Sequence, residues 1–351
     1  MATITGTAAG ETLTGTRAQD DIFGLGGHDT IRGRGGNDTI DGGTENDLLI
    51  GRTGSDNYLV DSELDKVVER LGEGDSDTVF ATISFTLRRN IENLELRGEA
   101  VRGYGNDLDN RLTVEEGQMV DNVLNGRGGA DFMSGGRGRD IYYVDDAGDV
   151  VDEIGDNEDD TVRSTISLDI GQFDKLAIDT FVENLFLLGS ADIDGAGGGV
   201  QNRIVGNSGD NEIRGMQGAD VLQGRDGNDS LYGGVDSGMD VLIGGEGQDG
   251  FYFEQYATIP YRDIINDFTA ADDTIYLDRS DFTEMPLGEL PESAFVRGSV
   301  PQDADDRILY DSDTGQIRYD PDGTGEQEAA FFAVVAPGTV LNANDFVGYG
   351  G

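Results

Sequence analysis

The sequence predicts an all-β fold: a parallel β-roll (β-solenoid) of nonapeptide repeats in three blocks, with β spacers between the blocks and a β-rich C-terminal cap. Three observations predict it: a nine-residue period, an acidic residue at a fixed place in that period, and a large apolar residue two places later. Strict repetition at a short period is typical of solenoids, because each repeat buries its apolar side chain only against its neighbours.

The first block is the most regular. From Gly6 the chain reads GTAAGETLT, GTRAQDDIF, GLGGHDTIR, GRGGNDTID, GGTENDLLI and GRTGSDNYL. After Glu11, the sixth place of the repeat holds Asp20, Asp29, Asp38, Asp47 and Asp56. The eighth place always holds Ile, Leu or Tyr, so each short x-U-x strand (U, a large apolar residue) has one inward side chain.

Two further blocks keep the same spacing. The second has Asn110, Asn122, Asp131 and Asp140 in the sixth place, and the third has Asn202, Asn211, Asp220, Asp229, Asp240 and Asp249. Extra residues before Asn122 and Asp240 interrupt the period, and insertions of that kind belong in loops. Two nonapeptides make one coil, so turns two repeats apart stack along the same edge.

The segments between the blocks also repeat. YLVDSELDKVVE (58–69) parallels YYVDDAGDVVDE (142–153), and DTVFATIS (77–84) parallels DTVRSTIS (160–167). Their alternation of apolar and polar residues predicts strands. We therefore divide the chain into block one (1–60), a spacer (61–102), block two (103–144), a spacer (145–194), block three (195–253) and a capping region (254–351).

The capping region has its own pattern. Segments 261–268, 272–278 and 329–335 are predicted strands, and Asp345-Phe346-Val347 stands near the end. Residues 307–320, RILYDSDTGQIRYD, predict a β-hairpin in which Gly315 supplies the positive φ of a short turn.

Composition excludes several classes of partner and chemistry. With 24 Lys+Arg against 70 Asp+Glu the formal charge is −46, which disfavours nucleic acid and anionic membrane surfaces. Without Cys there is no disulfide, thiolate nucleophile or iron–sulfur site, and the single His28 lies in a turn that we expect to be exposed. The sequence contains no run of 18 apolar residues, so we expect no transmembrane helix.

The repeat itself predicts a metal. Carboxylates stacked about 4.8 Å apart repel by roughly 3.5 kcal/mol at an effective dielectric of about 20. A cage of carboxylate and carbonyl oxygens suits Ca²⁺, and pairing stacked turns gives about ten ions. The predicted ligands are Asp20, Asp29, Asp38, Asp47, Asp56, Asp131, Asp140, Asp220, Asp229, Asp240 and Asp249, with Gly27, Gly36, Gly218 and Gly227 in the turns.

These nonapeptides resemble the RTX (hemolysin-type) calcium-binding repeats; GRGGNDTID and GRDGNDSLY fit nearly residue for residue. The tail, with DADDRILYDSDTGQIRYDPDGTG and a final DFV, resembles the C-terminal region of type I-secreted RTX proteins. The resemblance implies calcium binding, export by a bacterial type I apparatus and folding outside the cell. Glu11 and the four sixth-place asparagines depart from the pattern, and we expect weaker ligands or purely structural turns there.

The sequence leaves the biological role open. We favour a secreted structural, surface or matrix-adhesion protein that is not an enzyme, since no second motif supplies an acid or base in a cleft. The alternative is an anionic-polysaccharide-binding or accessory module of an alginate-type epimerase or lyase system. It would use arginines that we otherwise expect to pair with neighbouring acids: Arg32, Arg34, Arg127, Arg137, Arg139, Arg214 and Arg225.

Self-assembly into a lattice and attachment to the cell surface stay open. Residues 1–6 lack the basic and hydrophobic parts of a cleaved signal peptide, so we expect export without one. The repeats begin at Gly6, and we expect no membrane insertion. The aromatic residues of Tyr142-Tyr143 and Phe251-Tyr252-Phe253 are expected in the core.

Overall fold

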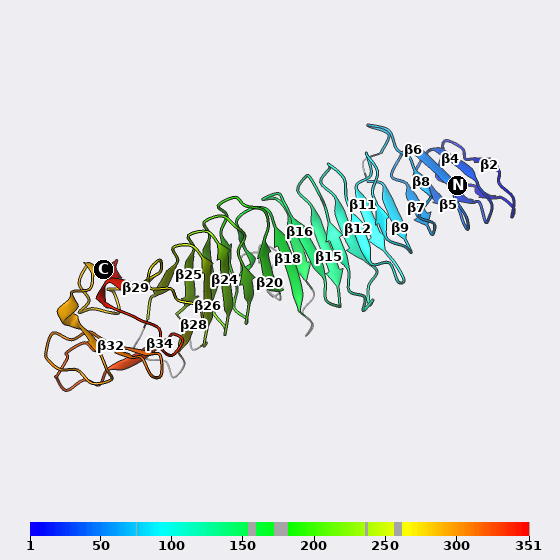
Figure 1. Cartoon of the computed structure of the whole chain (residues 1–351). Coiled ribbons are helices and arrows are strands. Elements are labelled where there is room, and N and C mark those ends of the chain that lie inside the picture. The colour runs from blue at the N-terminus through cyan, green and yellow to red at the C-terminus, as the bar shows by residue number, and fades with distance from the viewer. Residues whose placement is uncertain (75, 154–158, 172–181, 236–237, 256–261, 351) are drawn as a thin grey trace. The chain divides into compact units, whose positions relative to one another are not determined.

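Stacked coils of short parallel strands make up most of the chain in a computed structural model (Figure 1). The structure describes residues 1–350 except 75, 154–158, 172–181, 236–237 and 256–261. These residues form two units, 1–163 and 164–350. Within the described part of the chain there is no α-helix, and therefore no helix long and apolar enough to cross a membrane.

The first unit contains two sheets and part of a third. The first has the order β1 (Thr3–Thr5), β3 (Asp21–Phe23), β5 (Thr39–Asp41), β7 (Asn57–Val60), β9 (Thr78–Ala81), β11 (Asn93–Leu96), β13 (Arg111–Val114), β15 (Phe132–Gly136), β17 (Val150–Glu153). The second has the order β2 (Thr12–Thr14), β4 (Thr30–Gly35), β6 (Leu48–Thr53), β8 (Lys66–Val67). A further row is β10 (Phe85–Thr86), β12 (Arg102–Tyr104), β14 (Val123–Asn125), β16 (Ile141–Val144), β18 (Asp160–Ser164).

The second unit repeats this arrangement and then adds the capping region. One row is β19 (Leu168–Asp169), β21 (Gly195–Ala196), β23 (Glu212–Met216), β25 (Ser230–Gly234), β27 (Gly250–Phe253), β29 (Thr274–Asp278), β35 (Phe346–Tyr349), β30 (Gly288–Glu289). The other is β20 (Val182–Leu187), β22 (Arg203–Val205), β24 (Val221–Asp226), β26 (Val241–Glu246), β28 (Asp263–Ile265), β34 (Ala330–Val334), β33 (Gln316–Tyr319), β32 (Ile308–Asp311), β31 (Phe295–Arg297). Two short 3-10 helices, η2 (Glu292–Ala294) and η3 (Ala343–Asp345), lie in the capping region.

The strand register confirms the two-repeat coil. In β1 and β3, Thr3, Ile4 and Thr5 pair in parallel with Asp21, Ile22 and Phe23, eighteen residues later. Eighth-place side chains consequently stack in columns, and those from Ile22 to Tyr58 in block one are fully buried. In β3 to β6, one large buried side chain per strand fills the narrow interior. The predicted all-β parallel solenoid is therefore confirmed.

The capping region departs from the parallel pattern as its sequence predicts. Strands β32 and β33 form an antiparallel hairpin, with Ile308 opposite Tyr319 and Asp311 opposite Gln316. Gly315 has a φ of +76°, and a side chain there would collide with the carbonyl of Val335. The strands predicted over 272–278 and 329–335 are β29 and β34. Of the segment predicted over 261–268, residue 261 lies outside the described residues and β28 occupies Asp263–Ile265.

The expectation that all the paired aromatic residues are core was wrong for two of them. Tyr142, Phe251 and Phe253 are buried, whereas Tyr143 and Tyr252 are half-buried on the outer face. The reason is strand alternation: a neighbour of an inward side chain points outward. Tyr252 stacks between Tyr232 and Tyr276, with ring centroids 4.3 and 4.5 Å apart.

Candidate metal centre

The turns that carry the acidic residues depend on glycine. Gly27, Gly36, Gly218 and Gly227, the four predicted turn glycines, have φ values of +93°, +95°, +129° and +117°. A Cβ on Gly36 would also lie within 3.0 Å of the backbone of the coil before it, at Ala18 and Gln19. Only glycine combines this backbone conformation with so close an approach between coils.

One oxygen of each predicted aspartate holds the preceding coil. In every case Oδ1 accepts a hydrogen bond from the backbone N–H of the residue one coil earlier, as Asp38 does from Asp20. The N···O distances are 2.7–2.9 Å. The eleven residues that accept in this way are Asp20, Asp29, Asp38, Asp47, Asp56, Asp131, Asp140, Asp220, Asp229, Asp240 and Asp249. The structure therefore brings them together in ladders along the edges of the solenoid, and we call them the aspartate ladder.

The second oxygen of many ladder residues is buried and has no hydrogen-bond partner among the described residues. Those without one are Oδ2 of Asp29, Asp38, Asp47, Asp56, Asp131, Asp229 and Asp249. A buried carboxylate oxygen without a partner is costly, because it has lost water and gained nothing in return. The repetition of this arrangement indicates a binding position for a cation, which would accept an electron pair from the carboxylate oxygen.

Backbone carbonyls face the same spaces. A Cβ placed on Gly24 would lie within 3.0 Å of both Asp29 Oδ2 and the carbonyl oxygen of Gly42. A Cβ on Gly224 would likewise meet Asp229 Oδ2 and the Gly244 carbonyl oxygen. The missing side chain thus leaves a space lined by carboxylate and carbonyl oxygens, the donor set that Ca²⁺ prefers.

Electrostatics point the same way. Burial, with a smaller contribution from neighbouring carboxylates, raises the pKa of Asp56, Asp131 and Asp229 from 3.8 to about 7. The same causes raise the pKa of Asp38 and Asp249 to about 6. These groups resist ionisation because burial removes water from the charged carboxylate, and a divalent cation would reverse that effect.

The asparagines that begin the second and third blocks make hydrogen bonds of a different kind. The side-chain amide of Asn110 donates to the carbonyl oxygens of Ile91 and Glu92, at 3.0 and 3.2 Å. The amide of Asn202 donates to Val182 and Glu183 in the same way, at 2.9 and 3.3 Å. An NH₂ group therefore satisfies carbonyls at these first turns, which supports their interpretation as structural.

Six further aspartates, which were not predicted, extend the aspartate ladder. Each accepts the N–H of the ladder residue one coil earlier, for example Asp65 from Asp47 and Asp77 from Asp56, at 2.9 and 2.8 Å. The others are Asp149, Asp160, Asp263 and Asp273. Their signal was present in the sequence, because each begins an Asp-x-apolar triplet like those of the blocks. The two spacers and the start of the capping region therefore continue the ladder.

At two places, where the first and second blocks meet their spacers, a glutamate joins the ladder. Ligand oxygens of Asp56, Glu69 and Asp77 lie within 4.8 Å of one another, and so do those of Asp140, Glu153 and Asp160. At 4.8 Å and an effective dielectric of about 20, each pair of ionised carboxylates repels by about 3.5 kcal/mol.

The sequence match decides which kind of repeat this is. The family model of the RTX calcium-binding nonapeptide repeat matches residues 5–40, 32–61, 104–142, 116–151 and 205–238. The chain carries RTX calcium-binding repeats. Nine of the eleven predicted aspartates fall in the matched RTX segments, and Asp240 and Asp249 follow the last of them.

Comparison with whole proteins adds little to the RTX match. The structure titled "Crystal structure of extracellular lipase LipA from Serratia marcescens" is similar at 15% identity and a TM-score of 0.22, over 77% of this chain and 45% of the lipase chain. The chain therefore spans less than half of that lipase. So low a TM-score carries no structural argument, and the fold rests on the strand pairing described above. No curated protein sequence matches the chain significantly.

The arginines divide into two groups. Arg139 and Arg214 pair with Asp121 and Glu212, at 3.7 and 2.8 Å, as expected. For the other five the expectation was wrong, since none of them forms an ion pair with an acid in the described part of the chain: Arg127, Arg137, Arg225, Arg32 and Arg34. Arg32 and Arg34 both belong to β4. They lie in one hollow of about 760 Å³, which Arg17, Arg32, Arg34 and Arg52 line together with Thr14 and Thr53.

Proposed function

We propose that this chain is a secreted calcium-binding β-roll protein that folds when it binds Ca²⁺ outside the cell. In this proposal it has a structural, surface or matrix-adhesion role and no active site of its own. The observation that carries the proposal is the ladder of buried aspartate Oδ2 atoms without partners, repeated at the stacked turns. Calcium would be held between the carboxylate of one turn and the glycine carbonyl of the next coil.

The free energy involved supports calcium as the folding switch. At millimolar Ca²⁺, a site with a Kd of about 0.1 mM stabilises the folded state by about 1.4 kcal/mol. About ten such sites contribute on the order of 14 kcal/mol, comparable to the whole stability of an ordinary domain. Without the ions, stacked carboxylates and a net charge of −46 oppose the compact state.

Secretion is proposed on the same basis. RTX repeats are typical of proteins exported by type I systems, and the tail resembles the region that such systems recognise. A chain that is acidic, rich in glycine and free of cysteine stays unfolded at low Ca²⁺ and can pass through a narrow conduit. Calcium outside the cell would then fold it.

The stoichiometry of calcium binding tests this proposal. Calorimetric titration of the chelator-treated chain with CaCl₂ is expected to show about ten Ca²⁺ per chain, with no comparable binding of Mg²⁺. The proposal fails if the chain binds no Ca²⁺, or if Mg²⁺ occupies the same number of sites equally well. Electron microscopy with and without Ca²⁺ would show whether the folded chains assemble into a lattice.

A second candidate function is the binding of an anionic polysaccharide, and the hollow around Arg17, Arg32, Arg34 and Arg52 favours it. Arg34 and Arg52 occupy paired positions in β4 and β6, so two like charges are stacked, and neither forms an ion pair with an acid in the described residues. A polyuronate such as alginate would neutralise them.

The matched test uses Arg34→Gln with Arg52→Gln, which removes both charges and keeps a polar, unbranched side chain at these positive-φ positions. The exposed Arg70→Gln is the control. Retention on immobilised alginate that only the double variant loses would support this function, and equal retention of all three proteins would exclude it.

A further inference from the structure

The end of the first repeat block holds a group of residues that the nonapeptide pattern does not describe. Asp56 and Asp77 belong to the aspartate ladder, and Glu69 comes from the spacer coil between them. All three are buried, with exposed fractions of 0%, 6% and 0%. Their ligand oxygens lie within 4.8 Å of one another.

Glu69 is held firmly through one oxygen only. Its Oε1 accepts hydrogen bonds from the backbone N–H groups of Gly51 and Arg52, at 3.1 and 3.0 Å, and from the hydroxyl of Tyr58. Tyr58 itself is fully buried, so its hydroxyl is fixed in place. The spacer therefore delivers a preoriented carboxylate to the end of the ladder.

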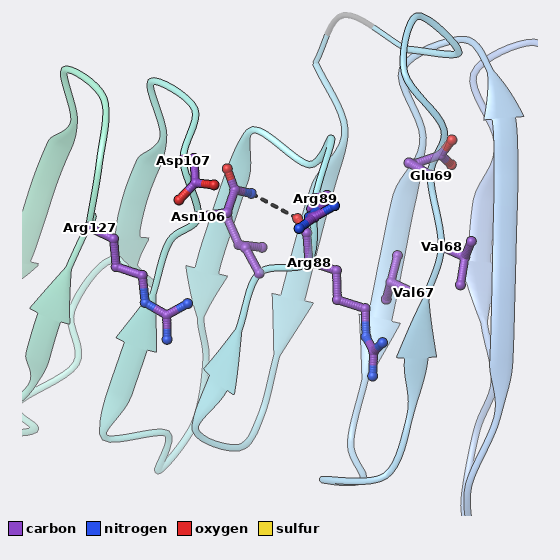
Figure 2. Close-up of a pocket in the computed structure, with 9 residues that line it drawn as sticks. Val67, Val68, Glu69, Arg88, Arg89, Asn106, Asp107 and Arg127 are labelled. Atoms are coloured by element: carbon purple, nitrogen blue, oxygen red, sulfur yellow. Dashed lines mark hydrogen bonds between the residues drawn. The ribbon is translucent and has the colours of Figure 1, made fainter.

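The other oxygens of the group have no partner. Asp56 Oδ2, Glu69 Oε2 and Asp77 Oδ2 are buried and accept no hydrogen bond from any described residue. No basic side chain of the described chain forms an ion pair with Glu69. Figure 2 shows its carboxylate pointing away from the side chains of Arg88 and Arg127, which line one hollow together with Glu69.

The same arrangement recurs at the end of the second block. Asp140, Glu153 and Asp160 are buried and bring their oxygens within 4.8 Å of one another. The hydroxyl of Tyr142 donates to Glu153 as Tyr58 does to Glu69. Both blocks thus end on two ladder aspartates, one spacer glutamate and one buried tyrosine.

We propose that each of these two groups binds one divalent cation, Ca²⁺ in the setting of the proposed function, on which this inference rests. The sites differ from those between ordinary turns, because the third carboxylate comes from the spacer and a tyrosine hydroxyl orients it. Calcium affinity rises with the number of charged ligands and with the rigidity of the site. We therefore expect these block-end sites to load before the turn-to-turn sites.

The first experiment counts ions. Calorimetric titration with CaCl₂ compares the full chain with Glu69→Gln, Glu153→Gln, the double variant and Glu63→Gln, an exposed control from the same spacer. We expect each single variant to bind one Ca²⁺ fewer, the double variant to bind two fewer, and Glu63→Gln to match the unmodified chain. Equal numbers in all five proteins would overturn the inference and leave the proposed function standing. No calcium binding by the unmodified chain would refute the proposed function instead.

A second experiment covers the case in which a glutamine variant does not fold. The chain has no Trp, so tyrosine is the sensitiser for bound Tb³⁺, and Tyr58 and Tyr142 contact the proposed ligands. We expect the first two equivalents of Tb³⁺ to give sensitised emission that the Tyr58→Phe, Tyr142→Phe variant lacks. Tyr143→Phe, an outward neighbour, serves as the control. Unchanged emission in the double phenylalanine variant would overturn the inference.

Discussion

Substitution of one ladder residue separates the two roles of its carboxylate. Asp38 accepts the N–H of Asp20 through Oδ1, at 2.8 Å, while its Oδ2 is buried without a partner. Asp38→Asn keeps an oxygen for that N–H and removes the charge. Asp38→Ala removes both, and leaves a buried N–H without an acceptor.

The magnitudes follow from this geometry. In 1 mM Ca²⁺, loss of one site with a Kd of about 0.1 mM lowers the free energy of unfolding by about 1.4 kcal/mol in Asp38→Asn. Asp38→Ala loses a further 1–3 kcal/mol or so, because the Asp20 N–H is left unsatisfied. Without Ca²⁺ the effect of Asp38→Asn reverses, because repulsion from Asp20 and Asp56, up to about 3.5 kcal/mol for each pair, is relieved.

Urea unfolding followed by circular dichroism measures both differences. In Ca²⁺ the order of stability should be unmodified chain, then Asp38→Asn, then Asp38→Ala. In excess chelator Asp38→Asn should have more β signal than the unmodified chain. If Asp38→Asn is as stable as the unmodified chain in Ca²⁺, or has less β signal in chelator, the reasoning about the ladder is refuted.

Three further predictions follow from the same structure. In chelator, the β signal in circular dichroism should grow as the pH falls from 7 to 4. The folded-state pKa values of Asp56, Asp131 and Asp229 are about 7, above the usual 3.8, so protonation of these groups favours the fold and their ionisation opposes it. A pH-independent spectrum would contradict this. Leu222→Ala should lower the free energy of unfolding in Ca²⁺ by about 2–5 kcal/mol, since Leu222 is fully buried. Leu71→Ala, at an 89% exposed position, should change it little. Similar urea midpoints for the two variants would argue against a core in which each strand contributes one large side chain. Gly36→Ala should lower the free energy of unfolding by about 1–3 kcal/mol in the same assay, because the φ of Gly36 is +95° and a Cβ there meets the backbone of Ala18 and Gln19. An unchanged urea midpoint would show that the coils can separate there.

The regular parts of the fold could be predicted because their determinants are local. Ile22 and Asp20 occupy fixed places in a nine-residue unit, and strand alternation with coil stacking then determines where each side chain lies. The same alternation also places Tyr252 outside when Phe251 is inside. That error came from treating a pair of aromatic residues as one unit.

The rest depends on contacts that the period does not encode. Asp77 follows Asp56 by 21 residues instead of eighteen, so it falls outside the repeat although it continues the ladder. Glu69 meets Asp56 and Tyr58 only because the spacer coil returns to the same edge. Arg34 and Arg52 likewise come together through coil stacking, and no acid is among the described residues that line their hollow.

The most direct test of calcium as the folding switch is far-UV circular dichroism of the chain during a Ca²⁺ titration. In excess chelator at pH 7 we expect a coil-like spectrum, because the ladder carboxylates and a net charge of −46 oppose the compact state. Millimolar Ca²⁺ should convert it cooperatively to a β spectrum, and chelator should reverse the change. A β spectrum that persists in excess chelator would contradict the account.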